Sequence, residues 1–65
     1  MIDVELRDSN DNLIKKMKLP FVPSVGDYIS LEIDDFFTYF HIKERWIRVE
    51  GNGVATACVS VEAKD

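Results

Sequence analysis

The residues that could do chemistry in this 65-residue chain are few and widely spaced. The single histidine, His41, and the single cysteine, Cys58, are the one pair that could act as a base and an activated nucleophile. No acid or third group is placed to orient His41, and a lone cysteine beside alanines is typical of a small packing residue. We therefore expect no catalytic residue and no enzymatic activity, and we interpret His41 as a surface residue.

Carboxylates are the second group with a chemical role to consider, since Asp34 and Asp35 are adjacent and Asp27 and Glu32 precede them. Calcium and magnesium sites need several oxygen ligands at defined spacings, and this stretch has no such loop. A zinc site needs a cluster of cysteine and histidine, which the chain lacks. The sequence predicts no metal and no other cofactor, and it indicates that these carboxylates lie in turns.

Twelve acidic and eight basic residues give a net charge of −4, which argues against nucleic-acid binding because that binding depends on clustered Lys and Arg. Apolar residues make up 46% of the chain and charged residues 31%, as in an ordinary folded domain. No apolar run reaches the length of a membrane helix, about 18 residues, and the N-terminus lacks the layout of a signal peptide. We expect one cytoplasmic domain, residues 1–65, that does not enter a membrane.

The stretch from residue 36 to 63 organises the fold, because both sides of Gly51-Asn52-Gly53 show the two-residue period of a pleated strand. On the outgoing strand the apolar side chains change parity between Ile42 and Ile47, which predicts a β-bulge at Glu44 or Arg45. On the return strand every odd position is apolar: Ala55, Ala57, Val59, Val61 and Ala63.

The loop length decides the register of this hairpin. A three-residue loop over 51–53 places Val49 opposite Ala55, and the bulge then places Phe40 opposite Ala63, so that one face stays apolar. A two-residue turn at Asn52-Gly53 would exchange the faces, and we prefer the longer loop. A helix over 34–47 is the competing interpretation, and a short helical turn over 34–37 is the exception we expect.

The first half of the chain predicts three further strands. Residues 2–7 alternate apolar and polar, and a turn-rich segment over 8–12 leads into a strand over 13–19, with Ile2 opposite Leu19. Pro20 and Pro23 end that strand, and a third strand follows over 28–33. The expected fold is all-β: a five-stranded small antiparallel barrel or strongly curled sheet, about the size of an SH3 domain, with a long bulged C-terminal hairpin.

A resemblance supports this fold class. The connector Leu19-Pro20-Phe21-Val22-Pro23-Ser24-Val25-Gly26-Asp27, followed by Phe40-His41-Ile42 and Trp46, resembles a pattern in short uncharacterised bacterial and phage-associated proteins. The resemblance implies an all-β chain, and it carries no function.

The seven aromatic residues are more than a core of this size can easily enclose. The bulge leaves Trp46 and Arg48 on the outer face of the long strand, where Tyr39 and His41 also lie, unless the sheet curls over Trp46. Tryptophan, tyrosine and arginine are the residues that binding hot spots favour. We interpret the chain as a non-catalytic interaction module that binds a protein partner or itself, as a homodimer, through this face.

Two other functions stay open. An acidic phage-type inhibitor that imitates nucleic acid would need Asp3, Glu5, Asp8 and Asp11 to line one surface. A single-stranded nucleic-acid binder would stack bases on Tyr39 and Trp46 beside the two guanidinium groups of Arg45 and Arg48.

Overall fold

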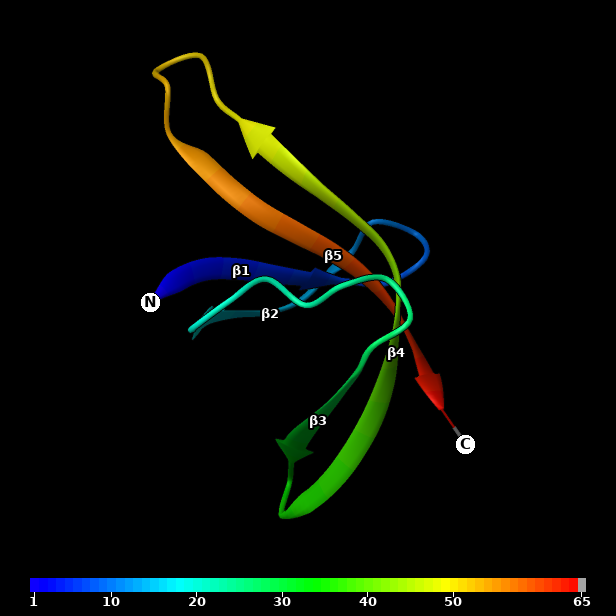
Figure 1. Ribbon diagram of the computed structural model, residues 1–65. Coiled ribbons are helices and arrows are strands. Elements are labelled where there is room, and N and C mark those ends of the chain that lie inside the picture. The colour runs from blue at the N-terminus through cyan, green and yellow to red at the C-terminus, as the bar shows by residue number, and fades with distance from the viewer. Residues whose placement is uncertain (65) are drawn as a thin grey trace.

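The computed structural model describes residues 1–64 and has five strands in one sheet, in the order β2-β1-β5-β4-β3. The sheet curls strongly into a half-barrel (Figure 1). This confirms the predicted all-β fold with a long, bulged C-terminal hairpin. The strands are β1 (Ile2–Arg7), β2 (Leu13–Leu19), β3 (Tyr28–Ile33), β4 (Phe36–Val49) and β5 (Ala55–Lys64).

One strand pair differs from the expected antiparallel arrangement, because β1 runs parallel to β5, with Val4 opposite Ala57 and Leu6 opposite Val59. The other three pairs are antiparallel. Each of those is a hairpin that its own turn specifies, whereas β1 and β5 lie at opposite ends of the chain. No local sequence signal sets the direction of such a pair.

The register predicted for the β4–β5 hairpin is confirmed. Val49 lies opposite Ala55 and Phe40 opposite Ala63, on either side of one register shift. The shift falls between Ile42 and Glu44, so the extra residue is Lys43, one position before the range we expected. The loop has three residues, as the hydrogen bond from the N–H of Glu50 to the carbonyl oxygen of Val54 shows, at 2.9 Å.

The strand that we preferred to a helix over 34–47 is confirmed, since β4 spans Phe36–Val49. The short helical turn that we expected over 34–37 is wrong. Asp34 and Asp35 have φ angles of 52° and 70°, and Ile33 pairs with Phe36 across them. Two central residues with positive φ form a type I′ turn, whose twist matches the flanking strands. Aspartate tolerates this left-handed conformation, so the two carboxylates make a hairpin turn and do not cap a helix.

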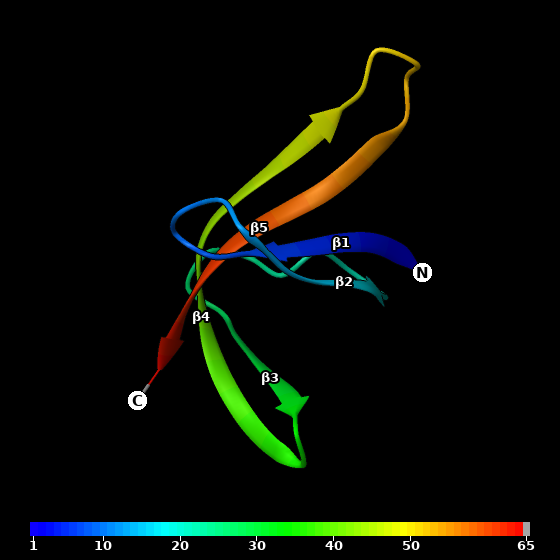
Figure 2. The same cartoon turned by 180° about the vertical axis from the view of Figure 1, so that it is seen from behind.

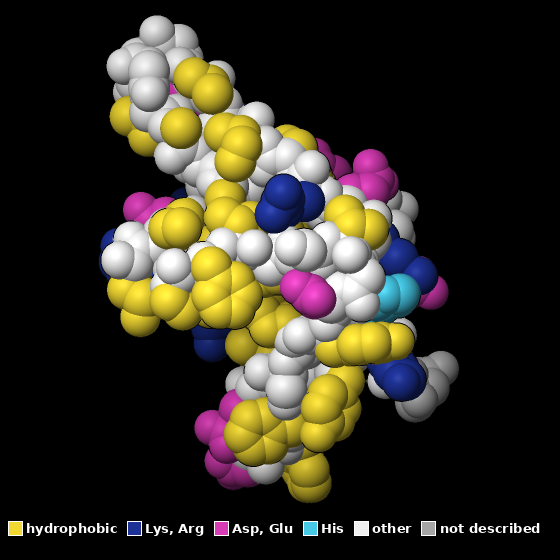
Figure 3. Space-filling model, viewed as in Figure 1, with side chains coloured by type: hydrophobic (Ala, Val, Ile, Leu, Met, Phe, Trp, Pro, Cys, Tyr) yellow, Lys and Arg dark blue, Asp and Glu magenta, His cyan; other side chains and the backbone are white. Residues whose placement is uncertain are grey.

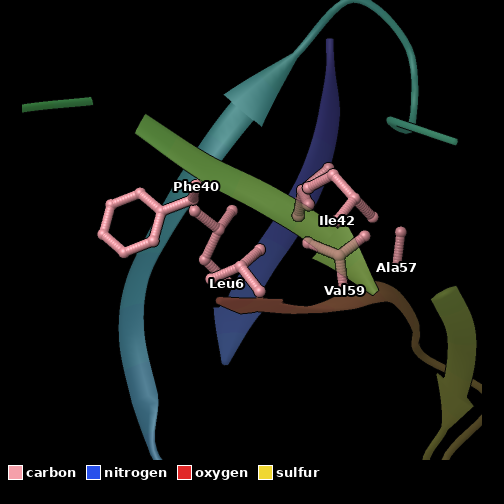
Figure 4. Close-up of a cluster of buried hydrophobic side chains, with 7 residues drawn as sticks. Leu6, Phe40, Ile42, Ala57 and Val59 are labelled. Carbon is pink, nitrogen blue, oxygen red and sulfur yellow. The ribbon is translucent and has the colours of Figure 1, made fainter. Parts of the chain in front are cut away.

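The core lies on the inner face of the curled sheet, where side chains from β1, β4 and β5 point toward one another (Figure 4). The connector between β2 and β3 runs back across the middle of the sheet (Figure 2), with Pro23 buried and Val22 packed against the core, while Phe21 stays exposed. The buried apolar residues of this cluster are Val4, Leu6, Phe40, Ile42, Ala57, Val59 and Val61.

The two faces of β5 can be tested with one charge placed on each. Ala57→Asp should lower the free energy of unfolding by about 3 kcal/mol or more, because it buries an unpaired carboxylate in the core. Thr56→Asp should cost less than about 1 kcal/mol, since Thr56 lies opposite Arg48 on the other face. Urea unfolding of both variants measures the difference, and equal losses would contradict the assigned faces.

The left-handed conformation of Asp35 in the β3–β4 turn leads to a second prediction about stability. Asp35→Gly should raise the free energy of unfolding by about 0.5 kcal/mol, because glycine adopts the left-handed conformation without a Cβ penalty. Asp35→Ala is the matched control and should lower it by about 1 kcal/mol, since alanine has neither glycine's freedom nor aspartate's local hydrogen bonding. Thermal unfolding of the three proteins would reject the turn assignment if alanine proved as stable as glycine.

Candidate binding surface

The four residues predicted to bind, Tyr39, His41, Trp46 and Arg48, lie on the same face of β4. Their partners on β5 are even-numbered residues between 56 and 64. The odd-numbered residues of β5 in this stretch, Ala57, Val59 and Val61, point into the core. The bulge at Lys43 keeps the two pairs on one face but separates them along the strand. The structure therefore brings the predicted residues onto one outer face, as two pairs.

The first pair, Tyr39 and His41, lies at an aromatic stack. The His41 ring lies on the ring of Tyr28, with centroids 4.7 Å apart and planes 17° from parallel, and the Nζ atom of Lys64 lies 4.8 Å from the Tyr28 centroid. Tyr39 lies beside this group, opposite Lys64, and is exposed. His41 thus has a packing role on the surface, while Tyr39 is available for contact.

Arg48 forms an intramolecular ion pair with Glu5. Its guanidinium donates two hydrogen bonds to the Glu5 carboxylate, from Nη1 to Oε1 at 2.8 Å and from Nη2 to Oε2 at 2.6 Å. Arg7 donates two more to the same Oε1 atom, from Nη2 at 2.8 Å and Nε at 3.1 Å. Glu5 is the buried member, with 5% of its side chain exposed. A guanidinium used in this way is a poor anchor for a partner.

The chemistry of Glu5 follows from these contacts. The hydrogen bonds from Arg48 lower the pKa of the Glu5 carboxyl to about 2, although burial alone would raise it. Arg7 adds to the lowering. Glu5 therefore stays ionised at neutral pH and serves as a structural counter-ion between two arginines.

Sequence reasoning missed this cluster, because it considered Glu5 for an acidic surface and did not pair it with a base. The signal was present in part: Glu5 is on the polar side of β1 and Arg48 on the polar side of β4. What was absent was the parallel β1–β5 pairing, which sets Glu5 beside Cys58 and so within reach of the side chains of β4.

Trp46 is 36% exposed, so the sheet covers part of it and leaves part of it open. It borders two hollows. One, of about 430 Å³, is also lined by Val22, Arg45 and Ile47. The other, of about 340 Å³, lies toward the turn between β1 and β2, beside Asp8. The two alternatives for Trp46, core or surface, therefore each hold for part of the side chain.

The three most exposed aromatic residues lie elsewhere: Phe36 and Phe37 on the β3–β4 hairpin, and Phe21 on the connector before β3. Figure 3 shows the apolar side chains gathered over that hairpin, which forms the lower lobe of the molecule. Phe36 is 76% exposed and Phe37 62%, and these two were not among the predicted binding residues. The surplus of aromatics was visible in the sequence, but the tight turn that leaves both phenylalanines at a hairpin tip was not.

Cys58 and His41, the pair considered as nucleophile and base, do not meet. Cys58 is buried opposite Trp46, whereas His41 lies opposite Glu62, four residues further along β5. Four residues of strand span roughly 13 Å, which is far beyond hydrogen-bond reach. Within residues 1–64, no group of three or more His, Cys, Asp or Glu side chains is arranged to hold a metal ion.

The geometry also bears on the two other functions. Of the four acidic residues, Glu5 is buried and Asp3 is bound by Lys18, with Nζ and Oδ1 2.7 Å apart. Asp8 accepts two backbone hydrogen bonds within its own turn. Arg45 lies opposite Val59 on the core face of β4, whereas Trp46 and Arg48 lie on its outer face, although Arg45 and Trp46 border one hollow. Glu5 therefore does not contribute to an acidic surface, and Arg45 does not lie on the face that carries Tyr39, Trp46 and Arg48.

No family model matches the chain, and no curated protein and no solved structure matches it significantly. Residues 1–64 contain no helix that is long and apolar enough to cross a membrane. The roles of the surface residues therefore rest on their contacts.

The Glu5 cluster predicts a pH dependence. A carboxyl whose pKa falls from about 4.5 unfolded to about 2 folded contributes stability above pH 4.5, and this is lost as the pH falls toward 2. Glu5→Gln should therefore cost about 2 kcal/mol at pH 7 and progressively less below pH 4.5.

Glu50→Gln is the control, since Glu50 approaches Arg48 only to 3.9 Å and is itself exposed. Urea unfolding at several pH values measures both variants. If the difference in the free energy of unfolding between wild type and Glu5→Gln stayed constant down to pH 2, the link between Glu5 ionisation and stability would be refuted.

Proposed function

We propose that this chain is a non-catalytic interaction module that binds a protein partner or a second copy of itself through side chains exposed along β4. The observation that carries the proposal is the apolar surface of the two hairpins that extend beyond the core. The exposed apolar side chains of β4 are Phe36, Phe37, Tyr39, Trp46, Ile47 and Val49.

The size of the surface supports this function. The chain exposes 4650 Å², whereas a compact protein of this length exposes roughly 4,200 Å². The molecule is elongated, with extents of 38 × 21 × 19 Å. Apolar surface gathered on projecting hairpins is typical of sites that bind other proteins.

The predicted binding residues contribute unequally to this proposal. Tyr39 and the open part of Trp46 are available for contact, whereas Arg48 is bound to Glu5 and His41 is stacked on Tyr28. The outer face of the C-terminal hairpin therefore offers aromatic contacts without a free arginine. Phe37 extends this face to the tip of the β3–β4 hairpin, opposite Glu32.

Two truncations at opposite ends of β4 test the proposal. Phe37→Ser should weaken self-association more than Trp46→Ala, because Phe37 is 62% exposed and Trp46 only 36%. Conversely, Trp46→Ala should lower the free energy of unfolding by about 2 kcal/mol, while Phe37→Ser changes it by about 0.5 kcal/mol or less.

Sedimentation velocity over a concentration series measures the association, and urea unfolding measures the stability. Emission from Trp46, the single tryptophan, reports whether its surroundings change on association. A wild type that stays monomeric up to about 1 mM would contradict binding to itself and leave only a different protein as partner. Equal losses of stability in the two variants would show that Phe37 belongs to the fold and not to a binding surface.

A further inference from the structure

The outer edge of β3 is a strand edge without a partner in the described chain, because β3 pairs with β4 on one side only. The hydrogen bonds of an antiparallel ladder alternate along each strand. The N–H of Ile42 donates to the carbonyl oxygen of Asp27 at 2.9 Å, which sets the phase of this ladder. The peptide groups of Ile29, Leu31 and Ile33 therefore face β4.

The peptide groups of the even-numbered residues, Tyr28, Ser30 and Glu32, face the free edge. Each has an N–H and a carbonyl that can pair with a strand from another molecule.

The other open edges carry several basic side chains that oppose such pairing, whereas the edge of β3 carries one charged residue, Glu32, and no basic residue. The opposite edge strand of the sheet, β2, contains Lys15, Lys16 and Lys18. Beyond residue 42, where β4 has no partner on its β3 side, the strand contains Lys43, Arg45 and Arg48. Lysine and other charges on an edge oppose the addition of a strand. Among the described strands, β3 is the one without a basic residue.

We propose that a second copy of this chain pairs its β3 antiparallel to this edge, so that the two half-barrels share one continuous ten-stranded sheet. The proposal rests on the interaction module proposed above and names its partner and its edge. The sequence of β3 is self-complementary about Leu31. With Leu31 opposite Leu31 of the partner subunit, Ile29 lies opposite the partner's Ile33, and Ser30 lies opposite the partner's Glu32.

This register gives three apolar cross-strand pairs on the inner face and keeps the acidic side chains apart. A register shifted by two residues, with Ser30 opposite the partner's Ser30, would leave only two apolar pairs, since Ile33 would then face the partner's Asp27. The register centred on Leu31 is therefore favoured.

The surface around this edge is large enough for a dimer. Tyr28, Phe37 and Tyr39 lie on one face of the β3–β4 hairpin, and Ile33 and Phe36 on the other, all of them exposed. An aromatic side chain can bury about 150–250 Å², so this group presents on the order of 500 Å² per copy at its exposed fractions. Two copies together present about 1,000 Å², which is about the minimum for a biological interface and typical of a weak dimer.

Ser30→Pro tests the edge, because its N–H points away from β4 and proline is tolerated at such an edge position. The variant should keep the fold and raise the Kd of the dimer about tenfold or more, since each copy loses an intermolecular hydrogen bond. Ser30→Thr keeps the N–H and should dimerise like the wild type. Circular dichroism checks the fold, and sedimentation equilibrium measures the Kd.

Amide hydrogen exchange of the wild type tests the same edge without a substitution. The amides of Ser30 and Glu32, which pair with each other across the proposed interface, should exchange rapidly in dilute protein and become protected as the concentration rises. The amides of Ile29 and Leu31, which face β4, should be protected throughout. If Ser30→Pro fails to fold, hydrogen exchange of the wild type still tests whether two copies pair through the β3 edge.

The outcomes separate this inference from the function on which it rests. A dimer that persists in Ser30→Pro, or that leaves the amides of Ser30 and Glu32 exposed, would overturn the β3 edge while self-binding through another surface stands. A wild type that stays monomeric to about 1 mM would overturn both the shared sheet and binding to itself.

Discussion

The parallel pairing of β1 with β5 is the constraint on which the rest of the structure depends. The chain folds as two locally specified pieces, the β1–β2 hairpin and the antiparallel β3–β4–β5 meander, and in the sheet they meet only where β1 lies beside β5. The core forms at this seam, since Val4 and Leu6 of the first piece pack with Val59 and Ile42 of the second. A two-stranded hairpin is at best marginally stable by itself, so the β1–β2 hairpin depends on its pairing with β5, which joins the hairpin and the meander into one domain.

The register of that seam is fixed on both faces of the sheet. On the inner face, a one-residue slip of β1 would turn Val4 and Leu6 toward solvent. A two-residue slip would keep the core face apolar, but it would place either Arg7 or Asp3 where Glu5 now meets Arg48. Arginine there would face a like charge, and the shorter aspartate would not reach as far. A buried ion pair is weak evidence for stability, but here it distinguishes registers that the core alone does not.

The strand pairs that the sequence predicts are local, and the pair that it does not predict joins distant parts of the chain. The turns at 8–12 and 51–53 and the two-residue periods specify their hairpins locally, so the pairs of β1 with β2 and of β4 with β5 were predicted correctly. The parallel pair joins the two ends of the chain, and no turn encodes it. The Glu5–Arg48 contact depends on that pair and was missed for the same reason. The helical turn over 34–37 was wrong because aspartates that can cap a helix can also form a left-handed turn.

The length of β4 explains why this small domain keeps so much apolar surface. Fourteen residues of straight strand would span roughly 45 Å, longer than the 38 Å of the whole molecule, so β4 bends and projects past the core at both ends. Residues at those ends are paired on one edge only, and none of the five strands in residues 1–64 covers their other edge. Basic residues stand along the open half of β4 and along β2, where they oppose strand addition. The β3 edge lacks basic residues and adjoins the exposed aromatic side chains of Phe36 and Phe37, so the two features that favour association coincide there.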